Sequence, residues 1–327
     1  MSEHILNMFP VNAEEKKEFE SLLPDAVWEY PHRSTVTPEQ LAAATVIMGW
    51  PKHTQMNLAT NLRWLQTLWM GADEYLAPGI LPEDVTITRC AGAYTRTVSE
   101  HMLGTLLAVC RRLPLCRDNQ RDHKWMDVRQ MRSVWGSTVL VVGAGDIGST
   151  FAQLCKGMGA HTVGLKRTIT GPIDGFDQLD TMDHLDDWLP KVDVVALILP
   201  HAPETVNLMD ERRIGLMKPD AILLSDGRGS VLDQDALARA MQAGHLWGAA
   251  LDVTVPEPLP EESPLWDIPN LFITPHVAGG LRMELSRKTA VTFCLENFRR
   301  YVNGQALQGV VRAGTAASER KADFSSN

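Results

Sequence analysis

The sequence is poor in cysteine, has no excess of basic charge and contains no long apolar run, and each absence excludes a class of protein. The five cysteines among 327 residues show no Cys-x-x-Cys spacing, which speaks against zinc and disulfide frameworks and fits a reducing compartment. No apolar run reaches membrane-spanning length, and the first residues show no signal-peptide pattern. We therefore expect a cytoplasmic protein with no metal and no membrane contact.

The charge balance bears on possible partners. The formal net charge is −9 and no basic run is present, which argues against a nucleic-acid partner. An anionic small molecule remains compatible, because a local cluster of Arg or Lys can oppose the overall sign. The length and the hydrophobic content of 44% are sufficient for two domains with full cores.

The most informative stretch is Thr138–Gly148, Thr-Val-Leu-Val-Val-Gly-Ala-Gly-Asp-Ile-Gly. An apolar, β-branched run enters a G-x-G-x-x-G turn and a helical segment, and a second strand pattern follows at His161–Leu165. In such a turn Gly143 permits the bend, Gly145 lets the backbone approach a pyrophosphate, and Gly148 allows close helix–strand packing. The helix N-terminus would attract the phosphates. The stretch predicts a dinucleotide site.

The tip of the second strand indicates which dinucleotide. Lys166, Arg167 and Thr168 stand where such sites usually carry an acid for the adenosine ribose. Basic and hydroxyl side chains suit a 2′-phosphate, so we expect NADP(H) to be preferred. The alternative is a solvated loop beside an ordinary site, in which case NAD(H) would serve.

Strand and helix patterns alternate in two segments of the chain. The expected strands are at residues 4–9, 26–30, 45–49, 64–68, 138–142, 161–165, 192–199, 221–224, 248–251 and 271–274. A long helix is expected at Val98–Leu113, with Thr97 as its N-cap and Glu100 completing a capping box. A last helix at Lys288–Asn303 would return to the first segment.

We therefore predict an α/β fold with two Rossmann-like or flavodoxin-like domains and parallel sheets. The dinucleotide-binding domain, residues 97–290, would be inserted into a discontinuous substrate domain, residues 1–96 completed by 291–327. The polar tail from Ala313 to Asn327 is expected to be disordered.

Three expected loops carry candidates for chemistry. Arg228 lies between two glycines, Glu257 lies between two prolines, and His276 follows a third strand. In an open parallel sheet the carboxyl ends of strands share one edge, where ligands bind. Arg can clamp the carboxylate of a 2-oxo acid, and His can move the proton that accompanies hydride transfer. A carboxylate on the far ring nitrogen would orient the imidazole and favour its charged form.

Each candidate also has a purely structural interpretation. His276 would then be a hydrogen-bonded structural residue, Glu257 a solvated turn residue, and Arg228 a surface partner of Asp226 or Asp233. The position of all three after strands downstream of a dinucleotide fingerprint favours the catalytic interpretation.

From about Asn61 to Val311 the sequence resembles the D-isomer-specific 2-hydroxyacid dehydrogenase family, which includes glyoxylate/hydroxypyruvate reductases. The resemblance implies that Arg228, Glu257 and His276 form the catalytic set and that Asp252 lies near the nicotinamide amide. It also places the Leu199–Thr205 loop at the cofactor, although Ala202 replaces the family's usual Thr. The implied cofactor-binding residues are Thr97, Gly143, Gly145, Asp146, Ile147, Gly148, Lys166, Arg167, Thr168, Pro200, Thr205, Gly227, Arg228, Asp252, His276 and Gly279.

The segment Asn61–Asp73 resembles the family's substrate loop, in which backbone N–H groups around Met70 and Gly71 would bind the substrate carboxylate. Here Leu68-Trp69-Met70 stands where many members have small residues. The family's usual substrates are therefore a poor guide to the substrate of this protein. Trp50 and Trp69 would form an apolar wall for a substrate side chain, or else belong to the core. The expected substrate-binding residues are Trp50, Trp69, Met70, Gly71, Arg228 and His276.

The resemblance implies an oxidoreductase that transfers hydride from NADPH to a small 2-oxo acid and yields the D-2-hydroxy acid. Phosphite or another small acid on the same scaffold is a second enzymatic alternative. A dinucleotide-sensing protein, like the corepressors that share this scaffold, is an alternative of another class. The family also suggests a homodimer, with Trp125 either at the dimer interface or as a surface anchor.

Overall fold

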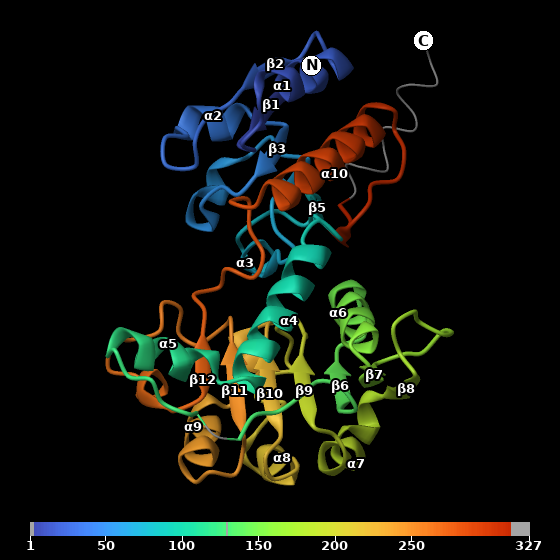
Figure 1. The fold of residues 1–327 in the computed structure, drawn as a ribbon. Coiled ribbons are helices and arrows are strands. Elements are labelled where there is room, and N and C mark those ends of the chain that lie inside the picture. The colour runs from blue at the N-terminus through green and yellow to red at the C-terminus, as the bar shows by residue number, and fades with distance from the viewer. Residues whose placement is uncertain (1–2, 129, 315–327) are drawn as a thin grey trace. The chain divides into compact units, whose positions relative to one another are not determined.

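The computed structural model describes residues 3–128 and 130–314, which fall into two compact units (Figure 1). Unit 1 contains the chain up to Tyr94 and from Gly280 onward, and unit 2 is Thr95–Gly279. The boundaries expected after residues 96 and 290 both lie later in the chain than these. Most of the tail expected to be disordered lies outside the described residues.

Unit 1 is built on a sheet with strand order β13-β5-β4-β3-β1-β2. All its pairings are parallel except that of β13 with β5, which is antiparallel. The strands are β1 (His4–Asn7), β2 (Val27–Glu29), β3 (Val46–Gly49), β4 (Trp64–Thr67), β5 (Thr86–Thr88) and β13 (Val310–Arg312). The helices are α1 (Ala13–Leu22), α2 (Pro38–Ala43), the 3₁₀ helix η1 (His53–Leu58), α3 (Asp73–Leu76) and α10 (Glu284–Val302).

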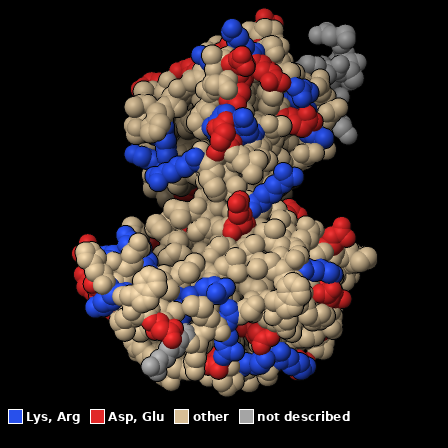
Figure 2. Space-filling view, viewed as in Figure 1, with Lys and Arg blue, Asp and Glu red and all other residues tan. Residues whose placement is uncertain are grey.

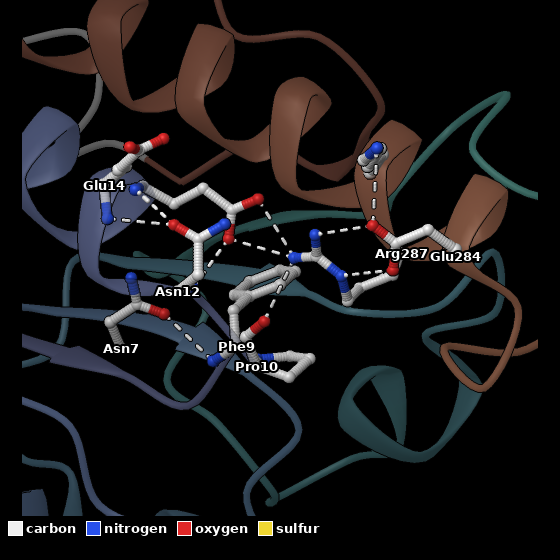
Figure 3. Close-up of polar contacts among 9 residues, drawn as sticks. Asn7, Phe9, Pro10, Asn12, Glu14, Glu284 and Arg287 are labelled. Atoms are coloured by element: carbon white, nitrogen blue, oxygen red, sulfur yellow. Dashed lines mark hydrogen bonds and ion pairs between the residues drawn. The ribbon is translucent and has the colours of Figure 1, made fainter.

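The returning helix α10 completes unit 1. At its start, Arg287 Nη1 donates to Glu15 Oε2 at 2.9 Å, and Arg287 Nε donates to Glu284 Oε2 at 3.1 Å (Figure 3). Further along α10, the Tyr301 ring stacks on Trp64 with centroids 4.8 Å apart, and Phe298 meets Trp28 edge-on at 5.2 Å. An ion pair and an aromatic cluster thus join the two chain segments of this unit.

Unit 2 is built on a parallel sheet with strand order β12-β11-β10-β9-β6-β7-β8. Chain order reverses at β6, the fingerprint strand, because the next strands along the chain lie on one side of it and the later ones on the other. The strands are β6 (Thr138–Val142), β7 (His161–Lys166), β8 (Gln178–Thr181), β9 (Val194–Leu197), β10 (Ile222–Ser225), β11 (Gly248–Leu251) and β12 (Leu271–Ile273).

The helices of unit 2 cover this sheet. They are α4 (Thr95–Cys110), α5 (Leu113–Arg121), α6 (Asp146–Gly157), α7 (Leu185–Trp188), α8 (Glu211–Leu216) and α9 (Gln234–Gln242), with 3₁₀ helices η2 (Met182–His184), η3 (Leu189–Lys191), η4 (Gly229–Val231) and η5 (Pro264–Asp267). Strands β9, β10 and β11 are buried along their whole length, as central parallel strands should be. The two mostly parallel sheets confirm the predicted α/β class.

The long helix differs from the prediction at both ends. It begins at Thr95, so Thr97 is a buried residue of its first turn and the predicted N-cap is wrong. It ends at Cys110 because Arg112 adopts a left-handed φ of 51°, after which α5 starts. The sequence pattern showed neither α5 nor the short strands β5, β8 and β13.

The surface charges are mixed. On the face drawn in Figure 2, basic and acidic side chains are interspersed in both units. Within residues 3–128 and 130–314, every helix is too short or too polar to cross a membrane.

Candidate active site

The dinucleotide fingerprint has the geometry of a phosphate cradle. Gly143 has a φ of +114°, and a Cβ there would lie 2.4 Å from the Ile198 carbonyl oxygen. A Cβ on Gly148 would lie 2.3 Å from the Gly143 carbonyl oxygen, so helix α6 packs directly on the turn. Around Gly145, which precedes α6, a Cβ would meet open space. The backbone at the helix N-terminus is therefore accessible to a pyrophosphate, and these residues fit a dinucleotide.

The basic tip lies at the end of β7. Lys166 is its last residue and half-buried, whereas Arg167 and Thr168 are exposed. Arg167 Nη1 lies 3.4 Å from Glu204 Oε1, and their side chains are 85% and 61% exposed. Since such an exposed pair contributes little free energy, an anion can displace Glu204 from Arg167 at small cost.

The hydroxyl group of Thr205 holds the backbone of the loop after β9. Thr205 is buried, and its Oγ1 donates to the Pro200 carbonyl at 2.7 Å and accepts the Ala202 N–H at 2.9 Å. This places Pro200 and Thr205 in a tight turn next to the fingerprint strand.

Arg228 lies in the loop after β10, held by close backbone packing. Gly227 packs against the Leu199 backbone and Gly229 against the Thr254 backbone. The Arg228 Nη1 donates to the Gly227 carbonyl at 2.9 Å. Asp233, considered above as a surface partner, caps helix α9 by accepting the Ala236 N–H at 2.9 Å.

His276 and Glu257 form a hydrogen-bonded pair. His276 Nδ1 lies 2.8 Å from Glu257 Oε2, and Glu257 Oε1 accepts the Thr254 N–H at 3.1 Å. The carboxylate therefore bridges the imidazole and the backbone of its own loop. His276 Nε2 has no hydrogen-bond partner in the described part of the chain, so this atom is free to exchange a proton with a ligand.

Asp252, after β11, is buried and holds the loop that carries His276. Its Oδ1 accepts the Thr274 hydroxyl at 2.6 Å and the Val277 N–H at 2.9 Å. Its Oδ2 accepts the Ala278 N–H at 3.0 Å. The family resemblance implies that Asp252 lies near the nicotinamide amide, and the structure shows its contacts with the loop that carries His276.

Three residues of this region were not predicted as part of the site: His101, Asp226 and Thr274. Ligand atoms of His101, Asp226 and Asp252 lie within 4.8 Å of one another. Because backbone N–H groups and a hydroxyl already point at both Asp252 oxygens, the cluster is a poor cation site. Burial and the nearby Asp252 raise the pKa of Asp226 well above its usual range, which favours the neutral form of this carboxyl group.

In unit 1, Trp69 of the expected substrate loop packs against Trp50, which follows β3. Trp50 and Trp69 meet edge-to-face with centroids 5.3 Å apart, and Trp69 also contacts Tyr94 at 5.7 Å. Trp50 Nε1 donates to Glu74, and the Arg33 guanidinium lies 3.9 Å from the centre of its ring. Both tryptophans are partly exposed, as are Met70 and Gly71, whereas Trp64 belongs to the core.

Trp125 is fully exposed in unit 2. It borders a hollow of about 680 Å³ lined by residues of α5 and the segment after it. Either interpretation of this residue, interface or surface anchor, is compatible with that exposure.

Comparison with known proteins identifies the family. A sequence profile described as "D-isomer specific 2-hydroxyacid dehydrogenase, NAD binding domain" matches residues 103–278, more than half of the chain. The chain belongs to this family. The resemblance drawn from the motifs is thereby confirmed.

Relatives of this chain include a glyoxylate reductase of Thermofilum pendens, 32% identical over 68% of each chain. A D-isomer-specific 2-hydroxyacid dehydrogenase family protein of Aeromonas salmonicida is 29% identical with a TM-score of 0.83, over 95% of this chain and 99% of that one. A family member from Xanthobacter autotrophicus, solved with NADPH, is 27% identical with a TM-score of 0.78, over 95% and 98%. The chain spans about half the length of the D-3-phosphoglycerate dehydrogenases it matches.

Proposed function

We propose that this family member reduces a small 2-oxo acid, such as glyoxylate or hydroxypyruvate, to the D-2-hydroxy acid and prefers NADPH. The observation that carries the proposal is the His276–Glu257 pair at 2.8 Å, with Arg228 in the neighbouring strand-end loop. His276, oriented by the Glu257 carboxylate, can transfer a proton to the carbonyl oxygen of a 2-oxo acid. The planar guanidinium of Arg228 can bind its carboxylate.

The proposed roles follow from the chemistry of each side chain. NADPH, held by the fingerprint turn and the tip of β7, would supply the hydride for the substrate carbonyl carbon. Arg228 clamps the carboxylate of the substrate and polarises its carbonyl, and His276 Nε2 gives a proton to the carbonyl oxygen. Glu257 holds the ring through Nδ1 and balances the positive charge that His276 carries before transfer.

The preference for NADPH is supported by the tip of β7. Lys166, Arg167 and Thr168 offer two positive charges and a hydroxyl, which suits the phosphate on the adenosine ribose. The solved relative from Xanthobacter autotrophicus contains NADPH. The fingerprint turn would supply further contacts with the cofactor. We assign the other predicted cofactor contacts to Thr97, Pro200, Thr205, Gly227, Arg228, Asp252, His276 and Gly279.

From unit 1 we assign Trp50, Trp69, Met70 and Gly71 to substrate binding. Backbone N–H groups around Met70 and Gly71 would bind the carboxylate, and the edge-to-face Trp pair would limit the side chain of the substrate. The relative named glyoxylate reductase supports a small substrate. The homodimer and the cytoplasmic location belong to the same proposal.

The test is a turnover assay with NADPH and NADH across glyoxylate, hydroxypyruvate and phenylpyruvate. We expect 2-oxo acid-dependent oxidation of NADPH, and in H276A a loss of roughly two to four orders of magnitude in kcat. H184A, which removes an exposed histidine of unit 2, should retain activity. Tight NADPH binding with no turnover of any 2-oxo acid would favour a sensing protein, and phosphite-dependent reduction of NADP⁺ would favour the other enzymatic alternative.

A further inference from the structure

The loop that carries His276 has an unusual backbone. His276 has a φ of +51°, a left-handed conformation that residues other than glycine rarely adopt. A residue remains there only when its surroundings hold it. The His276 N–H donates to the Asp252 carbonyl oxygen at 2.8 Å, and the next two N–H groups donate to the Asp252 carboxylate. Asp252 thus accepts three consecutive backbone N–H groups of this loop.

A further residue connects Asp252 to helix α4. Thr274 Oγ1 lies 2.6 Å from Asp252 Oδ1 and 3.0 Å from His101 Nε2. The carboxylate accepts hydrogen bonds on both oxygens, so the single hydroxyl proton of Thr274 goes to Asp252. His101 must then donate to Thr274 through Nε2–H. The direction of donation is therefore His101 to Thr274 to Asp252.

Two other ionisable groups face Asp252, and neither reverses the direction of these hydrogen bonds. His101 approaches from α4, with Nε2 3.6 Å from Asp252 Oδ1. Asp226 approaches from the loop after β10, and its buried Oδ2 has no hydrogen-bond partner in the described residues. Burial and the nearby Asp252 raise the pKa of Asp226, which favours its neutral form beside the Asp252 carboxylate.

We propose that His101, Thr274 and Asp252 form a positioning relay that holds the left-handed His276 loop in the geometry required for proton transfer. This proposal rests on the proposed role of His276. It assigns a function to His101 and Thr274, neither of which needs to contact substrate or cofactor. Asp252 acts here through its contacts with the loop, whatever it also contributes to binding the nicotinamide.

The test compares T274V with T274S in the full-length protein. Valine keeps the shape of threonine and removes the hydroxyl, whereas serine keeps the hydroxyl. We expect T274V to lower kcat by roughly tenfold to a hundredfold, since small displacements of catalytic groups have effects of this size. The KM for the 2-oxo acid should change by less than about threefold, and T274S should stay close to wild type. H101L, which removes the first donor from a different element, should reproduce the T274V pattern.

A second measurement does not depend on activity. Amide hydrogen exchange of Val277 and Ala278 in the cofactor-free protein should become faster in D252N and T274V, by about tenfold or more, and stay slow in T274S. Unchanged exchange at these amides, or equal kcat in T274V and T274S, would overturn the relay. If the wild type reduces no 2-oxo acid, the proposed function fails, and the exchange measurement still decides whether the relay holds the loop.

Discussion

His276 and Glu257 are 19 residues apart in the chain, yet the imidazole Nδ1 and the carboxylate Oε2 lie 2.8 Å apart. They meet because β11 and β12 are parallel neighbours whose carboxyl ends open into adjacent loops. Since Glu257 accepts from Nδ1–H, the other ring nitrogen of His276 is the one to which we assign proton exchange with the substrate in the proposed reaction.

The first prediction concerns the charge of Glu257. E257Q keeps the shape of the side chain but removes the negative charge that balances a protonated His276. We expect kcat for 2-oxo acid reduction to fall by roughly tenfold to a hundredfold, measured by steady-state kinetics at neutral pH. E261Q, which changes an exposed acid in the same segment, is the control. If E257Q retains at least half of the wild-type kcat, Glu257 does not orient or charge the imidazole.

The second prediction concerns the tip of β7. The double variant K166D/R167A removes both cations and supplies a carboxylate for a ribose hydroxyl. The ratio of kcat/KM for NADPH to that for NADH should fall by roughly a hundredfold or more, because two charge-assisted contacts with a phosphate are lost. K191A, at an exposed lysine elsewhere in unit 2, should leave the ratio unchanged. Equal use of both cofactors by the parent enzyme would contradict our interpretation of the tip.

The third prediction concerns the size of the substrate. W69A removes one ring of the edge-to-face pair with Trp50 and should enlarge the space for a substrate side chain. We expect kcat/KM for phenylpyruvate to rise relative to glyoxylate by about tenfold, a typical effect of reshaping an apolar pocket. W266A, which changes a tryptophan of unit 2 that is 50% exposed, serves as the control. An unchanged substrate ratio in W69A would place Trp69 outside the substrate pocket.

The fourth prediction concerns stability at acid pH. A hydrogen bond from the Lys156 ammonium, and another from the Thr162 backbone, lower the pKa of Asp177 to about 2. In the unfolded chain this pKa is about 3.9, so between roughly pH 4 and pH 2 the unfolded state binds more protons. The contribution of Asp177 is therefore fully present above this window and is lost as the pH falls through it.

The variant D177N should be less stable than wild type at pH 7, by no more than about 1 kcal/mol because solvent screens this exposed ion pair. The difference should shrink when urea unfolding is measured at pH 3 instead of pH 7. A constant difference between the two pH values would show that the charge of Asp177 does not contribute.

Much of unit 2 could be predicted from the sequence, because its central strands are short, apolar and β-branched and the glycine turn after β6 has few structural alternatives. The strand β5 was missed although Thr86, Ile87 and Thr88 are strand formers, since it has only three residues and its sequence neighbours include charged residues. The start of α4 was misplaced because Thr97 looks like an N-cap in the sequence, whereas it is a buried residue inside a helix that begins at Thr95.

The catalytic candidates could be placed on loops by pattern, since each follows a predicted strand. The contacts around them could not. Thr274 and His101 are 173 residues apart in the chain. No local sequence pattern indicates that a side chain of the first helix of unit 2 would donate a hydrogen bond to a residue near its last loop. The same holds for Asp226, whose pKa is raised by burial and by the nearby Asp252. Such relationships arise from tertiary packing alone.

The chain enters unit 2 at Thr95 and leaves it at Gly279 before α10 is made. During synthesis, Trp28 and Trp64 are therefore produced long before their aromatic partners Phe298 and Tyr301. On the ribosome, all of unit 2 is therefore synthesised before unit 1 is complete. Until α10 is synthesised, apolar side chains of the first segment of unit 1 lack their partners and remain exposed. The nascent chain consequently offers chaperones a binding surface on its earliest-made part until its last helix emerges.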